Sequence, residues 1–336
     1  MDSLTQIVLG AAVAGAVVPA AHRRAAMLAG AALGTLPDLD SFPIRLFTDD
    51  PVALMTLHRS FSHSLLVLPL LGWAIWAFFR RRGGRVAQAP RRWFWAIQLA
   101  LLTHPLLDAF TSYGTQLLWP LPLAPTVWSS VFIIDPGYTL WLLLGVAVAA
   151  FAGSRPLARQ ALVAGLALSS AYLGWSLLAK GMVEREAQRS LAQAGLAGAP
   201  MFSVPMPFNT LLWRVVAMTP DGYLEGEYSL AADTGPIAFR HHASDVEALA
   251  AVAGLPSVQR LAWFNRGFMK AEVRDGRLVL SDLRMGAEPD YSFNFAVAQS
   301  DGAGGWRAIA PEQLSWEWPA ARLGQMWDRI WHEPPR

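Results

Sequence analysis

Histidine and aspartate side chains recur at short intervals in the first 140 residues of an otherwise apolar sequence. Their nitrogens and oxygens are common ligands of zinc and manganese, and the absence of cysteine excludes thiolate ligands. A histidine and an aspartate four residues apart share one face of a helix. The pattern predicts a divalent metal site, with zinc as the expected ion and manganese as the alternative. The predicted ligands are Asp38, Asp40, His58, His63, His104, Asp108 and Asp135.

Two residues are assigned catalytic roles beside the metal. Asp38 and Asp40 lie one residue apart on a predicted turn, so one can bind the ion while Asp40 acts as a general base. Arg59 is interpreted as an anion clamp, because a guanidinium binds phosphate in a forked geometry. Each residue alone has a structural alternative, such as a solvated loop acid, a histidine bonded to a carbonyl or an interfacial arginine. The metal-site interpretation depends on the whole set converging.

The elements expected to position these residues are apolar helices. A helix needs roughly 20 residues to cross the hydrocarbon of a bilayer, and 54% of the chain is hydrophobic while only 15% is charged. We predict a polytopic α-helical membrane domain at 1–180 with about six segments, the first two of which form a short hairpin in an alternative arrangement. The segments are 5–21, 25–36, 64–79, 93–107, 138–152 and 158–179.

Arginines in the loops predict the orientation. The loops at 22–24, 80–92 and 153–159 hold ten arginines, whereas the alternate loops hold two. The positive-inside rule then places the predicted ligands, and everything after Lys180, on the extracytoplasmic side of a bacterial inner membrane. The opening MDSLTQ lacks the basic region of a secretory signal, so we expect the first segment to be retained.

The last 156 residues are less apolar than the rest. We predict a linker at 181–200 and a small extracytoplasmic α+β domain at 201–336. Turn signals at Pro220-Asp221-Gly222 and Asp275-Gly276 separate short segments of β character. The expected strands are 210–218, 223–230, 268–273, 278–283 and 291–298, and a helix is expected at 245–253.

Four motifs resemble the LexA-regulated inner-membrane metal-dependent hydrolase family, over about the first half of the chain. They are Met-Asp-Ser-Leu-Thr-Gln at the start, Leu36-Pro37-Asp38-Leu39-Asp40, His58-Arg59-x-x-Ser62-His63-Ser64 and His104-x-x-x-Asp108-x-x-Thr111-x-Tyr113-Gly114-Thr115. The family is similar in its helical metal site to zinc-dependent phospholipase C and P1-type nucleases, which implies phosphoester hydrolysis. One departure is Gln6, because the family opening usually reads Met-Asp-x-x-Thr-His. If that histidine is a ligand elsewhere, this chain lacks it.

The favoured function is therefore a membrane-bound metal-dependent hydrolase acting on phosphoester or lipid-linked substrates at the extracytoplasmic face. Membrane lipid is the expected partner, nucleic acid is not, and the sequence carries no signal for an oligomeric state. The alternative is a non-catalytic scaffold or sensor with a structural metal and a partner-binding soluble domain. A transporter is disfavoured because its polar groups would lie at several depths of the membrane.

Overall fold

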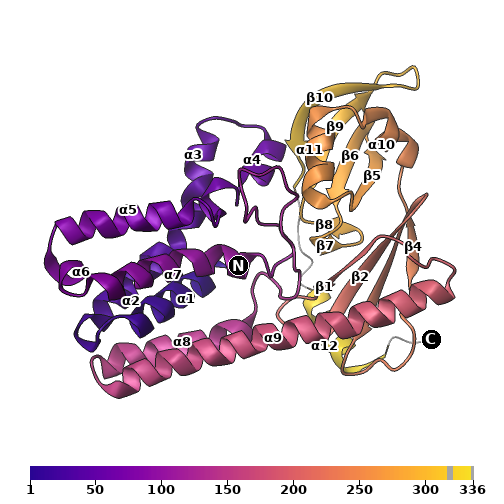
Figure 1. The fold of residues 1–336 in the computed structure, drawn as a ribbon. Helices are drawn as coiled ribbons and strands as arrows, with labels where there is room; N and C mark the ends of the chain where they lie inside the picture. The colour runs from indigo at the N-terminus through magenta and orange to yellow at the C-terminus, as the bar shows by residue number, and fades with distance from the viewer. Residues whose placement is uncertain (316–320, 334–336) are drawn as a thin grey trace. The chain divides into compact units, whose positions relative to one another are not determined.

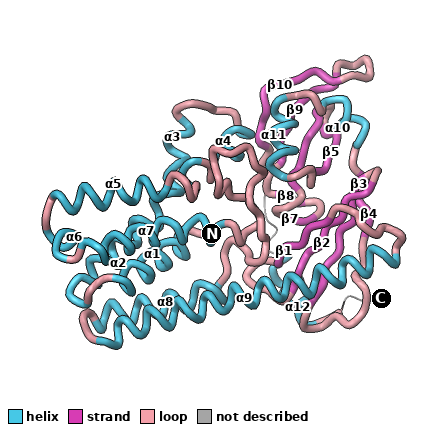
Figure 2. The backbone as a smooth tube through the Cα atoms, in the orientation of Figure 1, coloured by secondary structure: helices cyan, strands magenta, loops and turns pink. Residues whose placement is uncertain are grey.

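The computed structural model describes residues 1–315 and 321–333. The chain divides into two compact units (Figure 1). The helical unit comprises Met1–Pro43 and His58–Ser176, and the sheet unit comprises Ile44–Leu57 and Leu177–Arg336. In the described chain, every named strand follows residue 200 (Figure 2). The segment Ile44–Leu57 thus belongs to the sheet unit, although Asp40 before it and His58 after it belong to the helical unit.

The helical unit is built from α-helices and 3-10 helices, with a long irregular segment at 109–135. They are α1 (Ser3–Val17), η1 (Ala20–His22), α2 (Arg23–Thr35), η2 (Leu36–Asp40), α3 (Ser41–Arg45, which crosses into the sheet unit), η3 (Phe61–His63), α5 (Leu68–Arg81), α6 (Gly84–Gln88), α7 (Pro90–Asp108), α8 (Pro136–Ala152) and α9 (Pro156–Gln193, which continues into the sheet unit).

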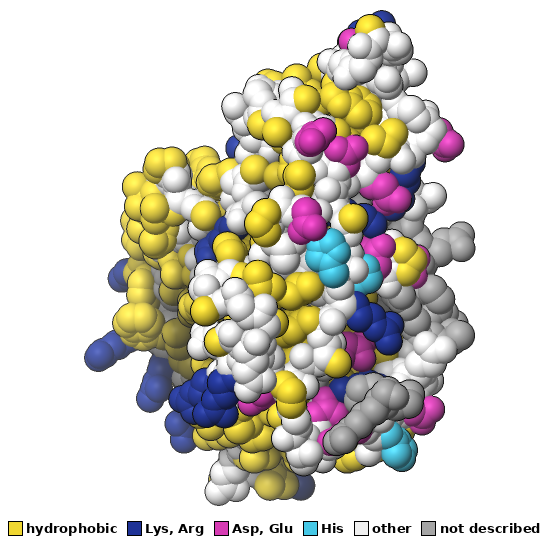
Figure 3. Space-filling view, turned by 90° about the vertical axis from the view of Figure 1, so that its right-hand side faces the viewer, with side chains coloured by type: hydrophobic (Ala, Val, Ile, Leu, Met, Phe, Trp, Pro, Cys, Tyr) yellow, Lys and Arg dark blue, Asp and Glu magenta, His cyan; other side chains and the backbone are white. Residues whose placement is uncertain are grey.

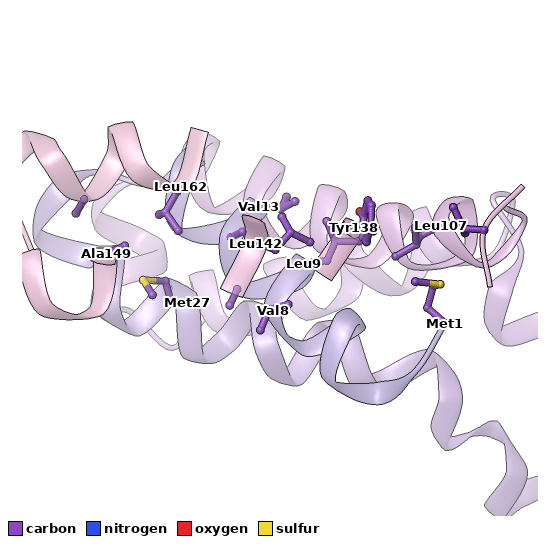
Figure 4. Close-up of a cluster of buried hydrophobic side chains, with 14 residues drawn as sticks. Met1, Val8, Leu9, Val13, Met27, Leu107, Tyr138, Leu142, Ala149 and Leu162 are labelled. Carbon is purple, nitrogen blue, oxygen red and sulfur yellow. The ribbon is translucent and has the colours of Figure 1, made fainter. Parts of the chain in front are cut away.

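Helix α1 lies at the centre of this unit. Ten of its fifteen residues are buried, and its side chains pack with residues of α2, α7, α8 and α9 in one apolar cluster (Figure 4). Small residues allow the backbones of α1 and α2 to approach closely: a Cβ added at Gly10 would lie 2.1 Å from the carbonyl oxygen of Gly30. The hydrophobicity of α1 on all sides is explained by this central burial.

The prediction of a membrane domain with about six segments is wrong. Among the described residues, one helix, Pro156–Gln193, is long and apolar enough to cross a membrane. A second candidate exists if Pro51–His63 and Leu68–Arg81, which are bent by 55° relative to each other, form one broken span. Helix α1 has 15 residues and extends about 22 Å, short of the ~30 Å hydrocarbon core. Other apolar runs that suggested spans form helices too short to cross, such as α5 with 14 residues and α8 with 17, and α1 is also largely buried. The extracytoplasmic position of the residues after Lys180 stays a prediction.

The sheet unit contains two four-stranded antiparallel sheets with the orders β1-β2-β3-β4 and β10-β9-β6-β5, and a two-stranded ribbon, β7-β8. Its strands are β1 (Met201–Pro205), β2 (Leu212–Thr219), β3 (Gly222–Ser229), β4 (Arg240–Ala243), β5 (Met269–Arg274), β6 (Arg277–Asp282), β7 (Gly286–Ala287), β8 (Asp290–Tyr291), β9 (Asn294–Ser300) and β10 (Trp306–Gln313). Its helices are α4 (Pro51–Leu57), α10 (Val246–Val252), α11 (Pro256–Asn265) and α12 (Ala321–Trp331).

The strands expected in this unit are present. The five predicted strands correspond to β2, β3, β5, β6 and β9, and the predicted helix at 245–253 corresponds to α10. Much of the predicted linker at 181–200 is helical, because α9 continues to Gln193. Helix α4 is held in this unit by Arg260 of α11, whose Nε donates to the Thr56 hydroxyl at 2.8 Å.

Candidate metal centre

Three elements of the helical unit bring the candidate ligands together. Asp38 lies in η2, directly after α2, and His63 ends η3. His104 and Asp108 lie one turn apart in the last part of α7. Backbone bonds fix the loop that carries His63, because Gln116 N–H donates to the Arg59 carbonyl at 3.0 Å. Ligands that are distant in the sequence therefore share one buried position.

Four ligand atoms converge: Nε2 of His63, Nε2 of His104, Oδ1 of Asp38 and Oδ2 of Asp108. Five of their six separations lie between 3.1 and 3.4 Å, and the sixth is within 4.8 Å. Four points with such separations lie about 2 Å from their common centre, which is a typical ligand distance for a small divalent cation. His63, His104 and Asp108 are buried, and Asp38 is partly exposed.

Hydrogen bonds at the opposite ring nitrogens fix the histidine tautomers. His104 Nδ1 donates to the Gly34 carbonyl at 2.6 Å. The Ser62 hydroxyl donates to Asp40 Oδ2 at 2.5 Å, so it accepts from His63 Nδ1 at 2.8 Å. In the neutral rings both Nε2 atoms then carry lone pairs, yet these atoms face each other at 3.1 Å. Such an arrangement needs a positive charge between the nitrogens, which either a proton on one ring or a bound metal ion can supply.

The carboxylate oxygens of the cluster also indicate that positive charge is needed at this position. Asp38 Oδ1 and Asp108 Oδ2 are buried and accept no hydrogen bond within the described chain. Burial alone would lower the pKa of His104, but the carboxylates of Asp108 and Asp38 raise it to about 9. The cluster therefore favours positive charge, and buried acceptors without donors are costly unless an ion satisfies them. The four residues can hold a metal ion.

Three predicted ligands lie outside this group of four. Asp40 Oδ1 accepts from His58 Nδ1 at 2.7 Å, and Asp40 Oδ2 accepts from the Arg59 backbone N–H at 3.0 Å. Burial favours a raised pKa at Asp40, but hydrogen bonds from His58 and Ser62 outweigh it and hold the pKa below its ordinary value. Asp135 caps the N-terminus of α8 by accepting from the Gly137 N–H at 2.9 Å. Asp40 and Asp135 thus support the surrounding structure, and His58 is held beside the group of four by Asp40.

Arg59 and Gln6 both contact Asp108. The Arg59 guanidinium is buried, with Nε 3.3 Å from Asp108 Oδ2, and it stacks on Tyr113 with its central carbon 5.0 Å from the ring centroid. Gln6 Nε2 donates to Asp108 Oδ1 at 3.0 Å, and the Met1 amino group contacts the same oxygen. At the position where the family opening has histidine, this chain thus has an amide that orients a ligand.

Three groups that support the site are not among the predicted ligands or catalytic residues. The Gly34 carbonyl is a backbone atom, so no residue type signals its role. Thr111, which donates to the Asp108 carbonyl at 2.7 Å and accepts from Arg59 at 3.3 Å, belongs to a polar run but has no distinctive spacing. Ser62 belongs to the motif His58-Arg59-x-x-Ser62-His63, and its place directly before His63 was a usable signal.

Replacing Ser62 with alanine is expected to weaken metal binding roughly 10- to 100-fold. The variant removes the acceptor of His63 Nδ1 and frees that ring to change tautomer. Competition with a metal-binding dye measures the affinity, and Ser154→Ala, at an exposed serine, is the control. Unchanged affinity in Ser62→Ala would show that the hydroxyl does not orient His63.

One of three comparisons with known proteins gave a match. The model of the YdjM inner membrane protein family matches residues 1–183, the part of the chain that carries all four clustered residues. The match confirms the resemblance to an inner-membrane family that the sequence motifs indicated. Neither the search of curated proteins nor the search of solved structures gave a match.

Proposed function

The chain belongs to the YdjM inner membrane protein family, and on this premise we propose that it is a metal-dependent hydrolase of phosphoester or lipid-linked substrates. One observation carries the proposal: four ligand atoms of Asp38, His63, His104 and Asp108 converge within 4.8 Å of one another, and the two carboxylate oxygens among them accept no hydrogen bond within the described chain. A buried arrangement of this kind would be unfavourable as a purely structural feature. Asp38 remains partly exposed, which leaves a route for a substrate oxygen to approach.

Zinc is the proposed ion. Two imidazole nitrogens and two carboxylate oxygens form a donor set that would hold zinc, which can expand its coordination to accept a further oxygen, whereas manganese favours more oxygen ligands. A bound zinc ion supplies Lewis acidity, which polarises a phosphoryl oxygen and acidifies water. Arg59, beside Asp108 Oδ2, partly neutralises the two carboxylates of the cluster.

We assign proton transfer to His58, in place of the general-base role that the sequence suggested for Asp40. Both oxygens of Asp40 are occupied by hydrogen bonds, and one of them holds His58 Nδ1 at 2.7 Å. This bond orients the His58 ring and leaves Nε2 available to exchange a proton. The ring is 24% exposed, and its centroid lies 5.9 Å from that of His63. A pair of this kind positions a base beside the metal site.

The test combines metal content with turnover by the full-length protein in detergent. We expect hydrolysis of bis(p-nitrophenyl) phosphate or of phospholipid to stop on chelation and to return with zinc. In His58→Gln we expect kcat to fall by about 10²–10⁴, as for loss of a general acid–base group, with unchanged zinc content. His241→Gln, at an exposed histidine of β4, is the control.

Two outcomes would contradict the proposal. Full zinc occupancy with no chelator-sensitive turnover of any phosphoester would favour the scaffold or sensor, in which the metal is structural. Full activity of His58→Gln would leave hydrolysis standing but remove His58 from proton transfer.

A further inference from the structure

One end of the helical unit carries ten arginines and no acidic residue. The α1–α2, α5–α7 and α8–α9 connections all lie at this end (Figure 1). Residues 18–24, 80–92 and 150–159, which form it, contain no aspartate or glutamate. We call it the basic end; its arginines are Arg23, Arg24, Arg80, Arg81, Arg82, Arg85, Arg91, Arg92, Arg155 and Arg159.

Carboxylates do not neutralise this charge inside the protein. The six arginines at 80–92 are exposed, and in the described chain none of the ten forms an ion pair with an acid. Arg23 and Arg24 instead donate to backbone carbonyls of Gly153 and Ala150, at 2.9 and 3.1 Å. By contrast, acidic, basic and histidine side chains are interspersed on the face shown in Figure 3. The basic end therefore presents a concentrated field of one sign.

Exposed apolar side chains accompany these arginines. Phe151, in the last turn of α8, is 88% exposed, and Phe78 and Phe79 are each 49% exposed. The guanidinium of Arg82 lies over the Phe78 ring, 4.7 Å from its centroid. Arginine combined with exposed aromatic rings is typical of segments at a membrane interface, where apolar stems enter lipid and charges meet headgroups.

An apolar groove of about 410 Å³ begins one turn from this end, between α5 and α7. On α7 it extends from Phe94 to Leu102, about 12 Å at 1.5 Å per residue, which is comparable to the roughly 15 Å depth of one hydrocarbon leaflet. Its mouth contains exposed Leu70 and Trp73. The groove can accept a hydrocarbon chain whose polar end lies at the arginines.

We propose that the basic end and this groove together bind an anionic phospholipid, the arginines contacting its phosphate and the groove its acyl chain. Charge complementarity selects an anionic headgroup, and the adjoining groove selects a lipid over free phosphate. A nucleic acid would neutralise the arginines but would leave Phe151 and the groove in water. The proposal does not depend on the hydrolase activity, because none of its residues belongs to the metal centre.

The test titrates lipids onto the full-length protein in detergent and counts bound copies by native mass spectrometry. We expect phosphatidylglycerol to bind at least about tenfold more tightly than phosphatidylcholine. The triple variant Arg80→Gln, Arg81→Gln and Arg82→Gln is expected to weaken phosphatidylglycerol binding roughly 100-fold. A control removes the same charge from exposed arginines of the sheet unit, namely Arg189→Gln, Arg240→Gln and Arg307→Gln, and should bind as the wild type does.

Further measurements distinguish binding of a whole lipid from binding of a free phosphate group. Phosphatidylglycerol with six-carbon chains should bind more weakly than the long-chain lipid, and inorganic phosphate at the same concentration should not compete. On the wild type, binding should weaken as salt is raised, which tests the arginines even if the triple variant fails to fold. Equal affinity for the two headgroups would overturn the proposal, and so would displacement of the lipid by a DNA duplex.

Discussion

Alanine at His63 or at Asp108 is expected to reduce the bound metal of the purified protein from about one equivalent to background. Each residue supplies one of the four clustered atoms, and both side chains are fully buried, so water cannot readily replace the missing ligand. We expect the larger effect in Asp108→Ala. In the wild type, Arg59 Nε lies 3.3 Å from Asp108 Oδ2. Without this carboxylate, the Arg59 guanidinium would remain beside the cluster unpaired with Asp108 and would repel a cation.

Elemental mass spectrometry of the two variants and the wild type measures this loss. His241→Ala and Asp328→Ala, both at exposed positions of the sheet unit, are matched controls and should retain the metal. Thermal unfolding gives a second readout, because a ligand at 1,000 times its Kd stabilises the folded state by about 4 kcal/mol. Zinc should raise the Tm of the wild type and of the controls only. Full occupancy in both site variants would exclude this cluster as the metal site.

The ligand set was predictable where local geometry fixes it. The four-residue spacing of His104 and Asp108 predicted one helix face, and the structure places their Nε2 and Oδ2 atoms 3.4 Å apart. The relation between Asp38 and Asp40 was not predictable. Both lie in η2, but Asp38 faces the histidine nitrogens while Asp40 receives hydrogen bonds from the His58–Ser62 loop. That difference depends on tertiary packing, which a spacing of two residues does not specify.

The helical unit shows why composition misled the prediction of spans. An apolar segment signals that water is excluded, but the excluding neighbour can be lipid or another helix. For α1 the neighbours are largely other helices of the same unit. The segments after residue 200 had less of this ambiguity, because they are short, rich in residues of β character and separated in part by turn residues. The strands there were accordingly predictable to within a few residues.

Packing of α1 against α2 also determines the geometry of the metal site. The Gly34 carbonyl of α2 accepts from His104 Nδ1, and Gln6 of α1 donates to Asp108 Oδ1. Both supporting groups lie where the two backbones approach closely, since a Cβ at Gly34 would lie 2.3 Å from the Gln6 carbonyl oxygen. The small residues that allow this approach therefore position two of the four ligands as well as the helices.

Gly34→Ala is accordingly expected to destabilise the protein by roughly 2–4 kcal/mol and to weaken zinc binding together with stability. The new methyl group meets backbone, which cannot rotate away, so α1 and α2 must separate and carry Gln6 and the Gly34 carbonyl away from the ligands. Gly174→Ala in α9, where a Cβ meets nothing within 4 Å, is the matched control and should be neutral or slightly stabilising, by at most about 1 kcal/mol. Thermal unfolding and zinc titration of both variants in detergent measure the two effects. If Gly34→Ala were as stable as Gly174→Ala but bound zinc poorly, a displaced Gly34 carbonyl, and not a loss of stability, would explain the weaker binding. If Gly34→Ala were as stable and also bound zinc normally, close packing of α1 and α2 would not determine the site.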